Sequence, residues 1–225
     1  IAVAAASGDA DIATAAKAGR ASVYASQAKW SDAVSDADAV LSAGGDNFKY
    51  AIPYFTESTG VYNRIYYATS GLGPYRAGTV WHTAYEEYSQ STNDARVAFT
   101  YTEKAGGAPW TPYGGTEITI ESGDATVNGK IIPWLVQQKY DSRESEIRLS
   151  SAQEMYLIKA ESALLSGSVA DAVTNINAVR TLAGVDPITA ADATEGWTML
   201  KRERGVELWL EGRRLGDMRR WKATS

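Results

Sequence analysis

Aromatic side chains close to glycine and proline are the residues of this sequence whose types and spacing could bind a ligand. Trp110 and Tyr113 flank a Gly- and Pro-rich stretch, while Trp81 and Tyr85 are spaced as on one face of a helix. Flat rings suit sugar recognition, because the C–H groups of a pyranose pack against a π-face. The sequence therefore predicts a ligand platform at these four residues, and Tyr101 is a further candidate.

The same rings could also fill a hydrophobic core. A core role is favoured for Trp81 and Tyr85, because aromatic residues at helical spacing more often face the protein interior. For Trp110 and Tyr113, which lie in a stretch that has the composition of a loop, an exposed binding role and a core role both remain open.

Catalytic chemistry finds little support in the sequence. A glycosidase holds two carboxyl groups roughly 5 to 9.5 Å apart across a cleft. The carboxylates of the middle segment are those of Glu86, Glu87, Glu103 and Glu117. Any chain with 27 acidic residues supplies such groups, and no spacing singles out a pair. We interpret the single histidine, His82, as a surface or hydrogen-bonded residue, and we predict a binding protein that is not an enzyme.

Composition excludes several other functions. The chain has no cysteine and one histidine, so thiolate metal sites, disulfides and a multi-histidine zinc site cannot form within it. No phosphate-binding loop or other cofactor motif is present, and we predict no cofactor and no metal. A net charge of −5 disfavours nucleic acid, and acidic residues interrupt the basic stretch 201–222. No apolar run approaches the roughly 20 residues that span a bilayer.

Helical hairpins must position the aromatic segment. Residues 14–27 and 31–42 read as two amphipathic helices whose small residues allow close approach, with Ser31 or Asp32 as N-cap and Gly44-Gly45 as the stop. Together they resemble a tetratricopeptide unit.

A second helical region begins after residue 150. We expect Ser150 or Ser151 to cap a helix that runs to about residue 166, with Glu154 completing a capping box. A partner helix follows at 169–182, and a last helix is expected at 198–210.

The segment between the helical regions has a different character. It contains most of the 13 tyrosines, and glycine and proline interrupt it repeatedly. A strand at 117–121 and a tight turn at Asn128-Gly129 predict a small β-hairpin within a mostly irregular segment. The expected fold is mainly α-helical, with a helical hairpin at 1–45, an irregular aromatic-rich segment at 46–148 that is the candidate ligand-binding region, and a helical C-terminal region at 149–225.

The C-terminal region carries a resemblance to a known family. Residues 149–161 resemble the segment that opens the last helical repeat of SusD/RagB-like proteins, and residues 172–184 are similar to the helix that follows it in the family. The most specific match is to the family's closing pattern, formed here by Arg202-Glu203-Arg204, Glu207-Leu208, Glu211-Gly212, Arg214, Asp217 and Arg220-Trp221. Weaker similarities lie in the hairpin at 19–41 and in Asp94-Ala95-Arg96.

The closing pattern also has a structural interpretation. Glu203, Glu207 and Glu211 lie four residues apart on one helix face and would repel one another if unpaired. We expect the arginines nearby in sequence to compensate them, namely Arg202, Arg204, Arg213 and Arg214. The side chains expected to dock the chain end against the preceding helices are Leu215, Met218 and Trp221.

The resemblance implies a function that the residues alone do not. SusD/RagB-like proteins are surface lipoproteins of the outer membrane that cap a TonB-dependent β-barrel transporter and pass it a glycan or, in some members, a peptide. The family's lipid-anchored cysteine has no counterpart here, so the anchor is expected in a further N-terminal region outside this chain. The alternative is a non-catalytic tetratricopeptide-like module that binds a protein partner and uses its aromatic residues as core.

Overall fold

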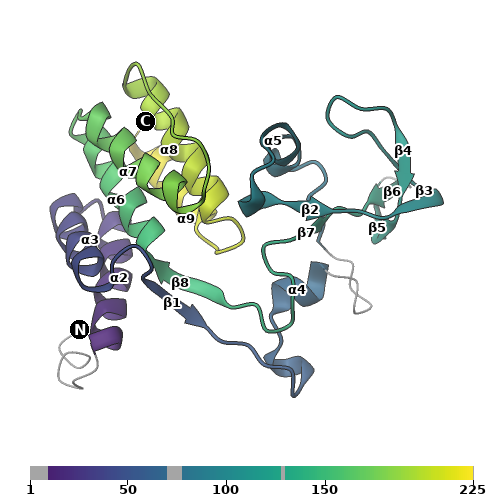
Figure 1. Cartoon of the computed structure of the whole chain (residues 1–225), viewed down its shortest axis with the longest axis horizontal. Helices are drawn as coiled ribbons and strands as arrows, with labels where there is room; N and C mark the ends of the chain where they lie inside the picture. Colours follow the sequence, from purple (N-terminus) through teal and green to yellow (C-terminus); the bar gives the residue numbers. More distant parts are fainter. Residues whose placement is uncertain (1–9, 70–77, 128–129, 225) are drawn as a thin grey trace. The chain divides into compact units, whose positions relative to one another are not determined.

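The computed structural model describes residues 10–69, 78–127 and 130–224, and the chain divides into two compact units (Figure 1). The scaffold unit combines Ile1–Ile52 with Arg148–Ser225, and the middle unit is Pro53–Ile147. The fold is mainly α-helical, as predicted. The tight turn expected at Asn128-Gly129 lies outside the described residues.

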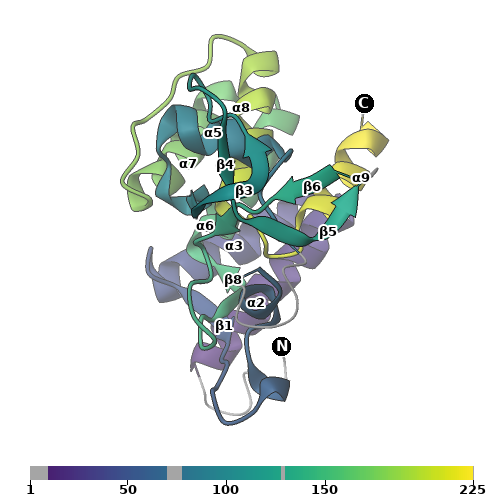
Figure 2. The ribbon, with the colours of Figure 1, turned by 90° about the vertical axis from the view of Figure 1, so that its right-hand side faces the viewer.

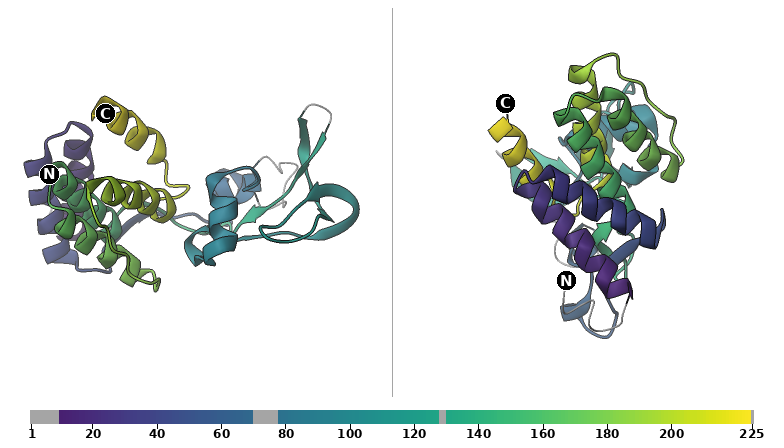
Figure 3. Two further views of the ribbon diagram at one scale, coloured as in Figure 1. Left: turned by 90° about the horizontal axis from the view of Figure 1, so that it is seen from above. Right: turned by 90° about the vertical axis from the view of Figure 1, so that its left-hand side faces the viewer.

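The scaffold unit opens with a helical hairpin of α2 (Ala10–Ser26) and α3 (Trp30–Gly44), which lie side by side in Figure 3. Their contact is built from alanines that are completely buried, among them Ala18, Ala21 and Ala33, so the helices approach closely as expected. The expected N-cap at Ser31 or Asp32 is wrong, because α3 begins at Trp30 after Lys29, whose side chain makes no capping bond.

A second hairpin follows β8 (Ile147–Ser151), a strand that pairs with β1 (Lys49–Ile52). Helix α6 (Ala152–Leu165) packs against α3 and against α7 (Val169–Leu182). Ser151 caps α6 as predicted, its Oγ accepting a hydrogen bond from the backbone N–H of Glu154 at 3.3 Å.

The two last helices differ from the expectation. Helix α8 (Ala193–Glu207) begins five residues before the expected start, because Asp192 accepts a bond from the Glu195 N–H at 2.9 Å and caps it there. Of the three side chains expected to dock helix α9 (Arg214–Thr224), only Trp221 is buried, at 8% exposed, while Asp217 and Arg220 of the same helix form ion pairs with Arg204 and Glu161 at 2.8 and 2.7 Å. The predicted docking of Leu215 and Met218 is wrong, because these side chains are 59% and 53% exposed.

Ion pairs join the segments of the scaffold unit. Glu203 and Glu207 lie on α8, whereas Glu211 follows the end of this helix, so the expectation that one helix carries all three glutamates is wrong. Arg180 of α7 pairs with Glu203 at 2.9 Å, and Arg148 of β8 pairs with Glu207 and Glu211 at 2.9 and 2.5 Å. Two of the arginines expected to compensate these glutamates, Arg204 and Arg213, form ion pairs with Asp217 and Glu154 instead. Such side chains are far apart in sequence, so only the fold brings them together.

The middle unit is assembled from short elements. These are η1 (Thr59–Val61), α4 (Arg64–Thr69), α5 (Ala84–Thr92), η2 (Ala95–Val97), β2 (Phe99–Thr100), β3 (Glu103–Trp110), β4 (Ile118–Ile120), β5 (Ser122–Val127), β6 (Lys130–Pro133) and β7 (Val136–Gln137). The strands pair antiparallel as β2–β7, β3–β4 and β5–β6, and β5 and β6 lie side by side in Figure 2. The strand predicted at 117–121 is present as β4, but it pairs with β3, and the strand that pairs with β6 is β5, so the first strand of the small hairpin was predicted wrongly.

A wide bulge shapes the longest strand pair. Both Glu103 and Ala108 of β3 pair with Ile120 of β4, so the intervening residues loop out of the ladder. Gly107 is required there, because a Cβ at this position would lie 2.1 Å from the carbonyl oxygen of Ile120. No helix within the described part of the chain is long and apolar enough to cross a membrane.

Candidate functional site

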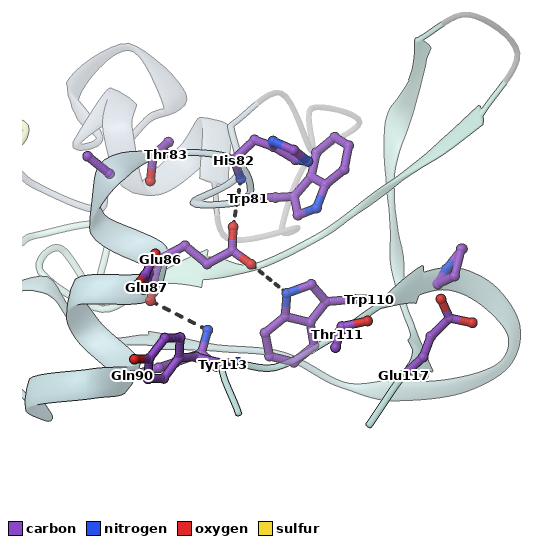
Figure 4. Close-up of a pocket in the computed structure, with 12 residues that line it drawn as sticks. Trp81, His82, Thr83, Glu86, Glu87, Gln90, Trp110, Thr111, Tyr113 and Glu117 are labelled. Carbon is purple, nitrogen blue, oxygen red and sulfur yellow. Dashed lines mark hydrogen bonds between the residues drawn. The ribbon is translucent and has the colours of Figure 1, made fainter. Parts of the chain in front are cut away.

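A cavity of about 630 Å³ lies in the middle unit (Figure 4). One wall comes from residues 81–90, which enter and form α5, and the other from residues 109–117, which end β3 and lead into β4. Its volume is within the range of small-molecule pockets, about 300 to 1,000 Å³.

The start of α5 sets the first wall. The Oγ1 of Thr83 caps the helix, donating to the Val80 carbonyl at 2.6 Å and accepting from the Tyr85 N–H at 3.4 Å. Before the cap, His82 takes a left-handed backbone conformation with φ of 57°, and its N–H donates to Glu86 at 2.7 Å. This tight entry holds the ring of Trp81 at the cavity, with the His82 ring edge-on at a centroid distance of 4.2 Å.

Glu86 ties the two walls together. Its second carboxylate oxygen accepts a hydrogen bond from the indole Nε1 of Trp110 at 2.6 Å (Figure 4). The Trp110 ring is also covered by Tyr101, at a centroid distance of 4.7 Å, and is only 4% exposed. Of the two roles left open for Trp110, the structure supports packing: the indole is a fixed wall of the cavity and not an exposed platform.

Tyr113 lies on a turn at the other wall. The Gly115 N–H donates to the Pro112 carbonyl at 2.9 Å, and Gly114 supplies the positive φ, 69°, that this turn requires. The backbone N–H of Tyr113 donates to Oε1 of Gln90 on α5 at 2.6 Å, which anchors the turn, while the side chain is 58% exposed. A fixed backbone thus presents a free aromatic ring beside the cavity.

The structure brings together three of the five predicted site residues. Trp81, Trp110 and Tyr113 line the cavity, whereas Tyr85 and Tyr101 do not line it. Tyr101, which is 42% exposed, packs on Trp110. Tyr85 is partly buried on α5.

Sequence reasoning missed the polar residues that organise the cavity, above all Glu86 and Gln90. The only local signal was the position of Glu86 in the first turn of a helix, where a carboxylate can reach back to a free N–H. Nothing in the sequence indicated that Trp110, distant along the chain, bonds to it.

The charge of the cavity is negative. Glu86, Glu87 and Glu117 line it, and no lysine or arginine does so among the described residues. Glu87 and Glu117 are exposed, and neither side chain makes an ion pair or hydrogen bond with another described residue. No group of three or more potential ligands for a metal ion occurs in the described ranges.

The motif Asp94-Ala95-Arg96 supports α5 from its C-terminal end. Asp94 caps η2, pairs with Arg96 at 2.7 Å and accepts from the Tyr88 hydroxyl at 3.3 Å. Burial works to raise the pKa of Asp94, but the hydrogen bonds and positive charge of Arg96, with Tyr88, leave the pKa below its usual value. The motif is therefore structural.

A second cavity, of about 530 Å³, lies in the scaffold unit. The Nζ of Lys201 lies 5.8 and 5.7 Å from the ring centroids of Trp197 and Trp221, which line this cavity. Both indoles are thus already in contact with a cation of the protein itself, which makes this cavity the weaker candidate for ligand binding.

Fold and cavity define an α-helical repeat protein whose loop-rich insertion carries an aromatic-walled pocket. The chain belongs to the SusD family, whose model matches residues 53–225. The match covers the whole middle unit, in which the sequence showed only one short motif of the family. A search of curated proteins found no match.

Solved structures share the fold at low sequence identity. A SusD-like protein from Bacteroides fragilis is 16% identical, with a TM-score of 0.56 over 93% of this chain and 54% of the other. A SusD-like carbohydrate binding protein from Bacteroides vulgatus is 17% identical, with a TM-score of 0.59 over 89% of this chain and 43% of the other. A SusD superfamily protein from Parabacteroides distasonis is 13% identical, with a TM-score of 0.59 over 92% and 52%. The chain spans about half the length of these relatives.

Proposed function

We propose that the protein is a surface nutrient-binding component of an outer-membrane uptake complex, which captures a glycan and passes it to a TonB-dependent β-barrel transporter. The observation that carries the proposal is the cavity of the middle unit, where a fixed indole wall and the exposed ring of Tyr113 meet. Membership of the SusD family and the carbohydrate-binding relative from Bacteroides vulgatus support the choice of a saccharide.

Binding without covalent chemistry suits this geometry. Trp81 and Tyr113 offer ring faces for pyranose C–H groups, and Gln90 and Thr111 place polar groups in the same cavity. Glu86 already uses both carboxylate oxygens to hold His82 and Trp110, so it is poorly suited to proton transfer. The proposed role is capture and release, with the lipid anchor supplied by the full-length protein.

Glycan binding is tested with the purified chain by isothermal titration calorimetry against oligosaccharides selected on a glycan array. We expect Trp81→Ala and Tyr113→Ala to weaken binding. Phe55→Ala is the matched control, because Phe55 is a 49% exposed aromatic residue of the same unit that does not line the cavity. Equal loss in the control, or no loss in either cavity variant, would place the glycan elsewhere.

The transporter role needs a separate experiment. The native protein is purified by affinity from detergent-solubilised outer membranes, and accompanying proteins are identified by mass spectrometry. A TonB-dependent barrel in near-equal amount supports the proposal. Recovery of a different protein partner, together with absence of glycan binding, would favour the interaction-module alternative.

A further inference from the structure

The ligand cavity of the middle unit is unusual in its charge. Its described lining contains the carboxylates of Glu86, Glu87 and Glu117 but no lysine or arginine (Figure 4). Arg96, which follows α5 in the sequence, is paired with Asp94 at 2.7 Å. A ligand entering the cavity therefore meets negative charge that no cation of the described lining neutralises.

The three carboxylates have different roles. Glu86 accepts from the His82 N–H and the Trp110 indole, so its charge is partly compensated by these donors and by the positive end of the α5 dipole, about half a unit charge. Glu87 and Glu117 are exposed, and their carboxylates bond to no other described residue. These two side chains, from opposite walls, are free to act on a ligand.

Charge near a ligand acts most strongly where water is partly excluded. Glu87 and Glu117 are exposed, so each exerts a moderate effect on a charged ligand, and this effect increases where a bound ligand displaces water from around them. A uronate or sulfate group placed in the cavity would be repelled by these carboxylates, and an uncharged sugar would not. A protonated amine would gain an ion pair with Glu87 or Glu117.

We propose that Glu87 and Glu117 make the cavity selective by ligand charge, so that amine-bearing saccharides bind best, uncharged saccharides bind next and uronic or sulfated saccharides are rejected. This inference rests on the proposed glycan-binding function and specifies its ligand class. Trp81 and Tyr113 provide the sugar contact, and the two glutamates select among sugars.

The test compares the chain with its Glu87→Gln/Glu117→Gln variant on a glycan array that carries amine-bearing, uncharged and acidic oligosaccharides, followed by calorimetry at low and high salt. We expect the variant to lose about five- to tenfold in affinity for amine-bearing glycans and to gain as much for acidic ones. High salt should weaken the binding of amine-bearing glycans to the wild type only.

Glu57→Gln/Glu103→Gln is the matched control, because both glutamates are exposed in the middle unit, line no part of the cavity and give the same change in net charge. It should bind as the wild type does. Acidic glycans bound by the wild type and lost in Tyr113→Ala would overturn the charge selection while leaving glycan binding intact. Unchanged selectivity in the Glu87→Gln/Glu117→Gln variant would also overturn the charge selection.

Failure of the proposed function has a different signature. If no glycan of any charge binds, or if only a basic peptide occupies the cavity, the saccharide assignment itself is wrong and the charge selection among saccharides is overturned with it. Thermal unfolding of the double variant close to that of the wild type confirms that the comparison concerns binding and not folding.

Discussion

The indole Nε1 of Trp110 donates a 2.6 Å hydrogen bond to the carboxylate of Glu86, and Trp110 is 4% exposed. A residue at the end of β3 is thus held to the first turn of α5 by one charged acceptor. The bond turns a residue that the sequence presents as part of a loop into a fixed wall of the cavity.

Glu86→Ala should lower the free energy of unfolding by about 1 to 3 kcal/mol, because it leaves the buried indole N–H without its acceptor. Glu86→Gln, which keeps one carbonyl oxygen, should lose less. Denaturant titration followed by tryptophan fluorescence measures both. Glu87→Ala, in the same helical turn but exposed, is the control, and an equal loss there would show that helix charge and not the Trp110 bond is responsible.

Truncation of Trp110 should lower stability, whereas truncation of Tyr113 should lower glycan affinity. Trp110→Ala removes a buried ring and should cost about 3 to 5 kcal/mol of stability. Tyr113→Ala removes an exposed ring, so stability should change by less than about 0.5 kcal/mol, while glycan affinity falls about two- to tenfold. Unfolding curves and calorimetry separate the two effects, and a stable Trp110→Ala variant that has lost only binding would contradict the assignment.

Arg148→Met should destabilise the scaffold unit by about 3 to 5 kcal/mol, because it removes the ion pairs of one guanidinium with two buried carboxylates, those of Glu207 and Glu211. Burial works to lower the pKa of Arg148, but Glu211 and Glu207 raise it overall, so the guanidinium stays charged. Arg202→Met on the exposed face of α8 should change stability by less than about 0.5 kcal/mol. Chemical denaturation of both variants distinguishes a buried network from surface charge.

A fall in pH should remove the contribution of Asp94 to the stability of the folded chain. Because the pKa of Asp94 is lower in the folded chain than its usual value, the folded state binds this proton less tightly. Its stabilising effect is therefore present above the unfolded pKa, about 4, and is lost as pH falls through the lower folded value. Asp94→Asn should lower stability at pH 7 and flatten the decline below pH 4, measured as urea midpoints against pH. An unchanged slope would contradict this.

Two glycine-to-alanine substitutions should change stability in opposite directions. Gly107→Ala places a Cβ 2.1 Å from the Ile120 carbonyl oxygen, so the β3–β4 pair must shift and stability should fall by about 2 kcal/mol or more. At Gly19, in α2, nothing lies within 4 Å of the added Cβ, and alanine should stabilise by about 0.5 to 1 kcal/mol. Thermal unfolding of both variants tests the paired expectation.

The helical elements could be predicted because their signals are local. Ser151 before an apolar run and Gly167 after it mark both ends of α6, and the structure places the helix between them. The start of α8 was missed although Asp192 and Glu195 have the spacing of a capping box, a signal that was in the sequence. In both helices, residues within one turn of the helix end carry enough information to predict where the helix begins.

The residues that pair with one another in the scaffold unit and in the cavity could not be predicted, because these ion pairs and hydrogen bonds join residues that are distant in sequence. Arg180 pairs with Glu203, and Arg148 pairs with Glu207 and Glu211, from elements distant in sequence, whereas sequence proximity suggested different arginines. Leu215 has the spacing of a docking residue but faces solvent, since periodicity does not say which side of a helix is covered. For the same reason, the aromatic residues were recognised as candidates, but their individual roles depended on Glu86.

The scaffold unit is one folding unit made from two stretches of chain, and residues 53–147 form a loop that leaves it at β1 and returns at β8. The entropy of closing such a loop grows slowly, by about 0.6 kcal/mol for each doubling of its length. Insertions and deletions within the middle unit should therefore change the stability of the scaffold unit very little. The middle unit is therefore the part of this chain that can change in size and sequence while the helical framework of the scaffold unit stays the same.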